Sequence, residues 1–188
     1  MSTILYKNGM LVTDSASVLD CNDINLFTVL DADKLIVSTC NRVVIAITGR
    51  VLAAKHCMID VADFLAQHLE KEGSLSEDDE VLRLSITNLS LKFNTSFSLI
   101  IMTSIGRQIY YMNHTIEKEE KAYTIRQIRY GDMFALGTGG VLAYSAAMSG
   151  LDIKDAVKFA IRHDNFSKPP LCYASMDELT KYEEVCDV

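Results

Sequence analysis

The chain opens with the segment Met1-Ser-Thr-Ile-Leu-Tyr-Lys-Asn-Gly-Met-Leu-Val-Thr-Asp14, which predicts a tight β-hairpin. Apolar residues flank Asn8-Gly9 on both sides. Asn-Gly between two such runs is the strongest short-range signal for a primed two-residue turn. Folding back at this turn would bring Ser2 and Asp14 to the same end of one sheet, so the hairpin predicts a hydroxyl and a carboxylate close together.

Ser2 has two interpretations. Initiator methionine is normally removed when the second residue is as small as serine, which would leave Ser2 with a free α-amine. A serine with its own amine beside its hydroxyl combines a nucleophile and a base in one residue. The alternative is that Ser2 is only the frayed start of an edge strand.

Composition limits the kinds of protein that this chain can be. Its 188 residues predict one domain, 1–188, with room for a substantial core. A net charge of -7 argues against nucleic acid as the main partner, because phosphate binding needs a basic face. No apolar segment approaches the roughly 20 residues that a bilayer-spanning helix needs. Neither nucleic acid nor membrane is therefore an expected partner.

The expected compartment follows from the start of the chain and from its cysteines. The first residues lack a basic segment followed by an apolar run, so we expect no signal peptide. Five cysteines are an odd number and form no C-x-x-C pair, which predicts reduced thiols in a cytoplasmic protein. They are Cys21, Cys40, Cys57, Cys172 and Cys186.

The first half of the chain is predicted to contain strands followed by two helices. We expect a loop over Ser15 to Asn25, then strands over Leu26 to Leu30, Leu35 to Ser38 and Val43 to Ile47. A helical apolar stripe between Val51 and Glu72 ends at Gly73. A second helix is expected to begin at Ser76 as its cap, with the acidic residues 77–80 facing the positive end of the dipole. The alternative interpretation of this acidic run is a metal site, but a helix start explains it better, and we expect no metal or cofactor.

The second half repeats this order. A hairpin is predicted over Phe97 to Ser104 and Gln108 to Met112, followed by a charged connector, Glu117 to Lys121, and a further strand pair that ends at Phe134-Ala-Leu. Helices are expected over Val141 to Met148 and Ile153 to Arg162, the latter capped by Asp152, and then a short strand around Leu171 to Ser175. This order predicts an α+β fold in four layers, an αββα sandwich of two antiparallel sheets between helix pairs.

The glycine-rich segment Gly137-Thr-Gly-Gly140 stands between a predicted strand and a predicted helix. Glycines in such a place can present backbone amides to a phosphate. However, the segment lacks the Lys-Ser/Thr ending of a P-loop and the third glycine of a dinucleotide fingerprint. A tight strand-to-helix turn is the alternative that these departures favour.

Taken in order, these motifs resemble one family over nearly the whole chain: the proteasome β-type subunits and their bacterial relatives of the HslV type, among the N-terminal nucleophile hydrolases. The opening Ser2-Thr-Ile-Leu resembles the Thr-Thr-Ile-Val that begins the mature family proteins. Leu11-Val-Thr-Asp14 resembles Leu-Ala-Ala-Asp, and Leu136-Gly-Thr-Gly-Gly140 resembles Ile-Gly-Ser-Gly-Gly. Lys34 has the family's lysine spacing ahead of the Thr-Gly turn at Gly49, and Asp164-Asn-Phe-Ser167 matches Asp-x-x-Ser.

The resemblance implies a role for each of these residues. Ser2 would attack an amide carbonyl while its own amine moves the proton. Lys34, oriented by Asp14, would stabilise the arrangement, and the Gly49 N–H would stabilise the oxyanion. Further support for the amine would come from Thr138, Asp164 and Ser167.

The resemblance also implies partners and an alternative. The implied substrate is a peptide or an unfolded protein, cut inside a homo-oligomeric ring whose contacts would use outer apolar residues such as Leu52, Ile59 and Phe64. It leaves open whether an unfolding ATPase docks there. Serine replaces the usual threonine, and the short hairpin is more like the compact proteasome-like proteins of bacteriophages, which would place the chain in the cytoplasm of an infected host. A non-catalytic assembly subunit that retains Met1 is the alternative function, because an acylated Ser2 nitrogen cannot act as a base.

Overall fold

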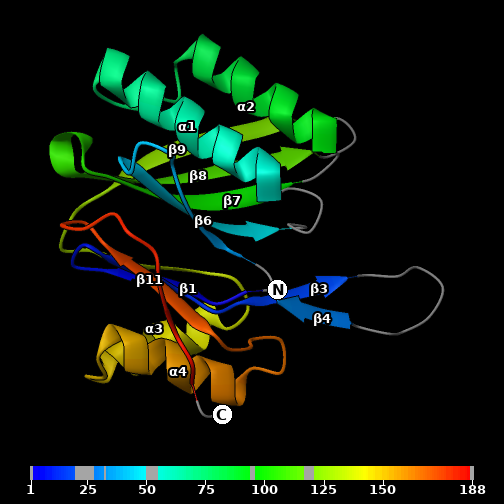
Figure 1. Cartoon of the computed structure of the whole chain (residues 1–188), viewed down its shortest axis with the longest axis vertical. Coiled ribbons are helices and arrows are strands. Elements are labelled where there is room, and N and C mark those ends of the chain that lie inside the picture. The colour runs from blue at the N-terminus through cyan, green and yellow to red at the C-terminus, as the bar shows by residue number, and fades with distance from the viewer. Residues whose placement is uncertain are drawn as a thin grey trace.

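The computed structural model of this chain describes residues 2–19, 28–31, 33–49, 55–93, 96–116 and 121–186. Within them, two five-stranded antiparallel sheets lie face to face between two pairs of helices (Figure 1). Helices α1 (Lys55–Glu72) and α2 (Glu80–Phe93) cover one sheet, and α3 (Gly140–Met148) and α4 (Ile153–His163) cover the other. The four-layer αββα sandwich predicted from the order of elements is confirmed.

The first sheet is built around the N-terminal hairpin. Its strand order is β10-β1-β2-β11-β12. Asn8 and Gly9 have φ values of 48° and 77°, the positive values that a type I′ turn requires, and the predicted hairpin is confirmed. The strand bounds are β1 Ile4–Lys7, β2 Met10–Thr13, β10 Met133–Leu136, β11 Leu171–Ser175 and β12 Tyr182–Glu184.

The second sheet has the order β5-β6-β7-β8-β9, in which every strand pairs with its neighbour in the chain. Long β-branched and apolar runs explain the central strands β6 and β7, since most of their residues are buried between a helix layer and the other sheet. Strands β3 and β4 form a separate two-stranded sheet. The bounds are β3 Ala16–Leu19, β4 Thr28–Asp31, β5 Leu35–Val37, β6 Val43–Gly49, β7 Phe97–Thr103, β8 Gln108–Ile116 and β9 Lys121–Ile128.

Three apolar layers hold the sandwich together. The central layer joins the two sheets, and its fully buried members include Ile4, Leu11, Val44 and Ile100. The outer layers lie beneath α1 and α2 on one side and beneath α3 and α4 on the other. Because both sheets are covered on both faces, side chains at the strand ends that point into the central layer are shielded from water.

Several predicted boundaries are confirmed, and others need correction. Asp152 caps α4 by accepting a hydrogen bond from the Lys154 N–H at 3.1 Å, and Gly73 ends α1 with φ 77°, as predicted. The loop predicted from Ser15 to Asn25 is wrong in part, because residues 16–19 form β3. These residues pair with β4, a tertiary partner that local composition does not reveal. The predictions for residues 20–27, 51–54 and 117–120 lie outside the described residues.

Two of the outer apolar residues expected to meet a neighbouring subunit lie on α1. Ile59 and Phe64 are half-buried and pack against the apolar layer beneath α1 and α2. They contribute to the packing of α1 on its sheet, and their contact with a neighbouring subunit stays a prediction. Leu52, the third such residue, lies outside the described part of the chain.

The start of α2 is the clearest correction among the helices. Ser76 does not cap it; the helix begins at Glu80, and the Asp79 carboxylate accepts the Leu82 N–H at 2.9 Å. The other oxygen of Asp79 lies 2.8 Å from Nε2 of His68 on α1. The Asp79 carboxylate is a better cap than the Ser76 hydroxyl, because it contacts α1 as well as the start of α2.

This cap gives a first prediction. Asp79→Ala should lower the free energy of unfolding by about 1–2 kcal/mol, since it removes an N-cap and its contact with α1. Ser76→Ala is the matched control, and it should change stability by less than about 0.5 kcal/mol. Urea unfolding of both variants measures the difference. A larger loss for Ser76→Ala than for Asp79→Ala would return the cap to the residue predicted from the sequence.

Among the described residues, no helix is long and apolar enough to cross a membrane. Within the same part of the chain, no three His, Cys, Asp or Glu side chains gather in a way that could hold a metal ion.

Candidate active site

The hairpin places the start of the chain beside Asp14. Ser2 and Thr3 precede β1, and Asp14 follows β2. The Asp14 N–H donates to the Thr3 carbonyl at 3.0 Å, which extends the β1–β2 ladder beyond the two strands. Ser2 and Asp14 are 1% and 0% exposed, so the hydroxyl and the carboxylate predicted to meet here lie in a buried setting.

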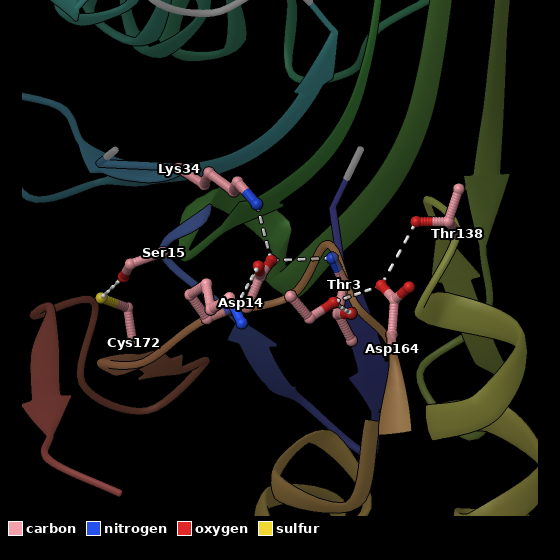
Figure 2. Close-up of polar contacts among 9 residues, drawn as sticks. Thr3, Asp14, Ser15, Lys34, Thr138, Asp164 and Cys172 are labelled. Atoms are coloured by element: carbon pink, nitrogen blue, oxygen red, sulfur yellow. Dashed lines mark hydrogen bonds and ion pairs between the residues drawn. The ribbon is translucent and has the colours of Figure 1, made fainter. Parts of the chain in front are cut away.

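The Asp14 carboxylate is the centre of one half of the site. Its Oδ1 accepts the Thr3 N–H and the Lys34 ammonium, each at 2.7 Å, and its Oδ2 accepts the Lys168 N–H at 3.3 Å. Figure 2 shows Asp14 between Lys34 and Thr3. Asp14 belongs to the first sheet and Lys34 lies just before β5 of the second, so this ion pair joins the two sheets across the sandwich.

Lys34 is an unusual lysine because its side chain is only 1% exposed. Burial lowers its pKa, since a charged ammonium is disfavoured away from water, while the charge of Asp14 and its hydrogen bond act in the opposite direction. The net pKa is lower than that of an ordinary lysine. Asp14 is therefore the main group that favours the charged form of Lys34.

The second half of the site is a chain of hydrogen bonds that ends on Thr3. Ser167 Oγ donates to Asp164 Oδ2 at 2.6 Å, and Thr138 Oγ1 donates to the same oxygen at 3.3 Å. Ser167 Oγ also lies 2.5 Å from Thr3 Oγ1. Because Ser167 spends its only hydroxyl proton on Asp164, Thr3 must be the donor in this short contact. These hydrogen bonds thus connect the Asp164 carboxylate to Thr3.

The glycine-rich turn between β10 and α3 closes over the start of the chain. The Gly139 N–H donates to the Ser2 carbonyl at 3.3 Å. A Cβ at Gly137 would lie 2.0 Å from the Ser2 carbonyl oxygen, and a Cβ at Gly139 would lie 1.9 Å from Thr3 Oγ1. Glycine is needed at both positions for this close approach, so the geometry supports the strand-to-helix turn over the phosphate loop.

Most of the residues predicted for the site come together. Asp14 and Lys34 form one contact group with Thr3; Asp164, Ser167 and Thr138 form a second on the other side of Thr3. Ser2 joins them through its carbonyl and its place in the chain.

Gly49 stands outside the contacts that the structure describes for these two groups. It ends β6, two positions beyond Ile47, whose N–H donates to the Lys34 carbonyl at 3.0 Å. Its φ of +142° and the 2.7 Å that would separate an added Cβ from the Ser96 carbonyl both require glycine. The backbone of Gly49 is thus tied to the Lys34 segment through β6, and its predicted oxyanion role stays a prediction.

Sequence reasoning missed Thr3, which connects the two halves of the site. Successive side chains of an extended segment point to opposite sides, so attention to Ser2 alone overlooked its neighbour. The 164-residue separation between Thr3 and Ser167 gives no local signal. Ser15 was also missed; its hydroxyl lies 3.4 Å from the buried thiol of Cys172, whose pKa is raised by burial.

Comparison with known proteins gives a consistent result at the level of the fold. No protein-family model matches the sequence, and no curated protein matches it either. Among solved structures, HslV from Trypanosoma brucei superposes with a TM-score of 0.55 and 17% identity, over 92% of this chain and 97% of that one. The Thiobacillus denitrificans protein BPH, solved in complex with epoxomicin, has a TM-score of 0.55 and 19% identity, over 95% and 98%. The chain therefore shares, over nearly its whole length, the fold of HslV and BPH.

Proposed function

We propose that this chain is a proteasome-like peptidase of the N-terminal nucleophile type, in which Ser2 acts once Met1 has been removed. One observation carries the proposal. A buried Asp14–Lys34 ion pair and the Asp164–Ser167–Thr3 chain converge on the first residues of the hairpin from opposite sides. A strand end that needed only to pack would have no use for a fully buried carboxylate and a fully buried lysine, which are costly to desolvate.

The chemistry assigned to Ser2 uses two groups of one residue. A hydroxyl is a weak nucleophile at neutral pH and needs a base, and an α-amine has an ordinary pKa of about 7.7–8.0. Ser2 Oγ would attack the peptide carbonyl while its proton passes to the α-amine. The amine would then protonate the leaving amine of the substrate, and water would hydrolyse the ester formed on Ser2.

The surrounding residues are assigned to support these steps. The positive charge of Lys34 would lower the pKa of the nearby amine through like-charge repulsion, and Asp14 would keep Lys34 charged and oriented. Asp164, Ser167 and Thr138 would hold the first residues in place, with Thr3 as their point of contact. The Gly49 N–H remains the candidate donor to the oxyanion.

The proposed substrates and assembly follow from the fold shared with HslV and BPH. We propose that the chain 1–188 acts as one domain, cuts peptides or unfolded proteins, and forms a homo-oligomer. Because BPH was solved with epoxomicin bound, that compound is a rational first probe of Ser2. On gel filtration, the protein should elute well above the 20.9 kDa of a single chain.

Ser2→Ala tests the proposal directly. Intact mass first establishes that the purified protein lacks Met1. Loss of the nucleophile should then reduce peptide hydrolysis by a factor on the order of 1,000 or more, by analogy with other covalent hydrolases. Ser149→Ala, on an exposed hydroxyl after α3, is the control that should leave hydrolysis unchanged.

Two results would contradict the proposal. Hydrolysis that survives Ser2→Ala would show that another group is the nucleophile. If protein shown to lack Met1 neither hydrolyses a broad peptide library nor gains the mass of epoxomicin, the fold serves a non-catalytic assembly role instead.

A further inference from the structure

The C-terminal strand of the first sheet contacts the backbone segment that carries Lys34. Lys181, which immediately precedes β12, forms an ion pair with Asp33, the residue before Lys34. Its ammonium also lies 2.7 Å from Glu183 Oε1. The Lys181 and Asp33 side chains are 21% and 22% exposed, so the pair is largely shielded from solvent.

This ion pair closes a ring of contacts around the Asp14–Lys34 pair. The strand register places Glu183 of β12 beside Cys172 of β11, and Cys172 beside Thr13 of β2. Thr13 is followed by Asp14, which binds Lys34, and Asp33 returns to β12 through Lys181. Every link in the ring is a strand pairing, a peptide bond or an ion pair. A displacement of β12 is therefore expected to change the position of Lys34.

The backbone around Lys34 is held on both of its sides. On its C-terminal side, β5 is a three-residue edge strand, and the Lys34 carbonyl accepts the Ile47 N–H at 3.0 Å. On its N-terminal side, Asp33 is held by Lys181. A lysine side chain has four flexible bonds, so its ammonium is placed accurately only when the backbone beneath it is fixed.

The charges in the ring are ordered as well. Lys181 forms an ion pair with Asp33, the carboxylate that precedes Lys34 in the chain. Hydrogen bonds to Asp33 and Glu183 outweigh the desolvation of Lys181, so that its pKa is raised and it stays charged across the neutral range.

We propose that Lys181 is a positioning residue for Lys34, acting through Asp33, so that strand β12 near the C-terminal end completes the site at the N-terminal end. The catalytic consequence of this inference rests on the proposed peptidase function, whereas the placement of Lys34 does not.

The test separates these two levels with Lys181→Ala and a matched control, Lys158→Ala. Lys158 lies on α4 and also forms an ion pair with β12, through Glu184 at 2.6 Å, so it connects β12 to α4 and not to Asp33. The first measurement is the rate at which acetic anhydride acetylates the Lys34 amine in the folded protein, read by peptide mass spectrometry. We expect Lys34 to be protected in the parent protein and in Lys158→Ala, and to react markedly faster in Lys181→Ala.

Activity supplies the second measurement. We expect kcat to fall roughly 10- to 100-fold in Lys181→Ala with little change in KM, because small displacements of a catalytic group have effects of that size. Lys181→Arg keeps the cation and should restore both Lys34 protection and kcat. Asp33→Asn breaks the same ion pair from the other side and should reproduce Lys181→Ala, which guards against a variant that simply folds poorly.

The outcomes distinguish the inference from the proposed function. Unchanged protection of Lys34 in both Lys181→Ala and Asp33→Asn would overturn the inference, as would an equal loss of protection in Lys158→Ala. Faster acetylation in only the two ring variants, in a protein that hydrolyses no peptide, would uphold the placement of Lys34 and count against the peptidase.

Discussion

Asp14→Asn is expected to lower the free energy of unfolding by about 3–5 kcal/mol, because it leaves the Lys34 ammonium buried without its counter-charge. The substitution keeps the shape of the side chain, so the loss reports on charge and not on a cavity. Asp14 also accepts two backbone N–H groups, from Thr3 and Lys168, and one of these would face an amide nitrogen in the variant. Urea unfolding at pH 7 measures the change.

Asp177→Asn is the matched control for this prediction. Its carboxylate pairs with Arg107 at 2.8 Å, the same kind of contact, but the two side chains are 75% and 56% exposed. An exposed ion pair contributes only about 0–1 kcal/mol. If both substitutions cost the same small amount, the Asp14–Lys34 pair is solvated in solution and the buried arrangement described above is wrong.

The pH dependence of Asp14→Asn follows from the lowered pKa of Lys34. Loss of Asp14 removes the main influences that raise this pKa, so it falls further. A lysine whose folded pKa lies below its unfolded value carries a penalty that is full at low pH and is relieved as pH rises toward the unfolded pKa. The stability of the variant should therefore recover between neutral and alkaline pH. The double variant Asp14→Asn/Lys34→Met should recover stability at pH 7 as well, because no unpaired charge remains.

The sequence predicted the parts of the site that have local or motif signals. The hairpin follows from Asn8-Gly9 alone, since a positive φ at both positions selects one turn type. The positions of Asp14, Lys34 and Asp164 were predicted from motif order and spacing, and the contacts of the structure bring them together. These motifs could be placed from the sequence because each one lies at the end of a strand or helix with a clear hydrophobic pattern.

What the sequence could not predict depends on partners far along the chain. Thr3 acquires its importance from Ser167, and Asp79 becomes the cap of α2 because His68 lies beside it. Strand β12 has the sequence Tyr-Glu-Glu, which carries no strand pattern, yet Tyr182 stacks on Tyr173 at 5.3 Å. Its Glu184 pairs with Lys154 and Lys158 of α4, which no local rule anticipates.

Gly137→Ala is expected to cost about 2–5 kcal/mol and to abolish any activity that depends on Ser2. Gly137 has φ +83°, and an alanine Cβ would lie 2.0 Å from the Ser2 carbonyl oxygen and 2.6 Å from its carbon. These are backbone atoms held by the β1 ladder and by the Gly139 N–H, so they cannot rotate away as a side chain would. The turn, the start of the chain, or both must shift.

Gly73→Ala isolates the backbone part of this cost. Gly73 has φ +77°, close to that of Gly137, but nothing lies within 4 Å of the position where its Cβ would be. It should therefore show only the strain of a left-handed alanine, about 1–2 kcal/mol, and full peptide hydrolysis. Thermal unfolding and kcat measured on both variants separate strain from collision. Equal stability losses in the two variants, with activity retained in Gly137→Ala, would mean that the glycine turn does not press on Ser2 and that the start of the chain is free to take another position. A larger loss in Gly137→Ala, with an inactive enzyme, would mean that the turn fixes the nucleophile by direct contact with its backbone.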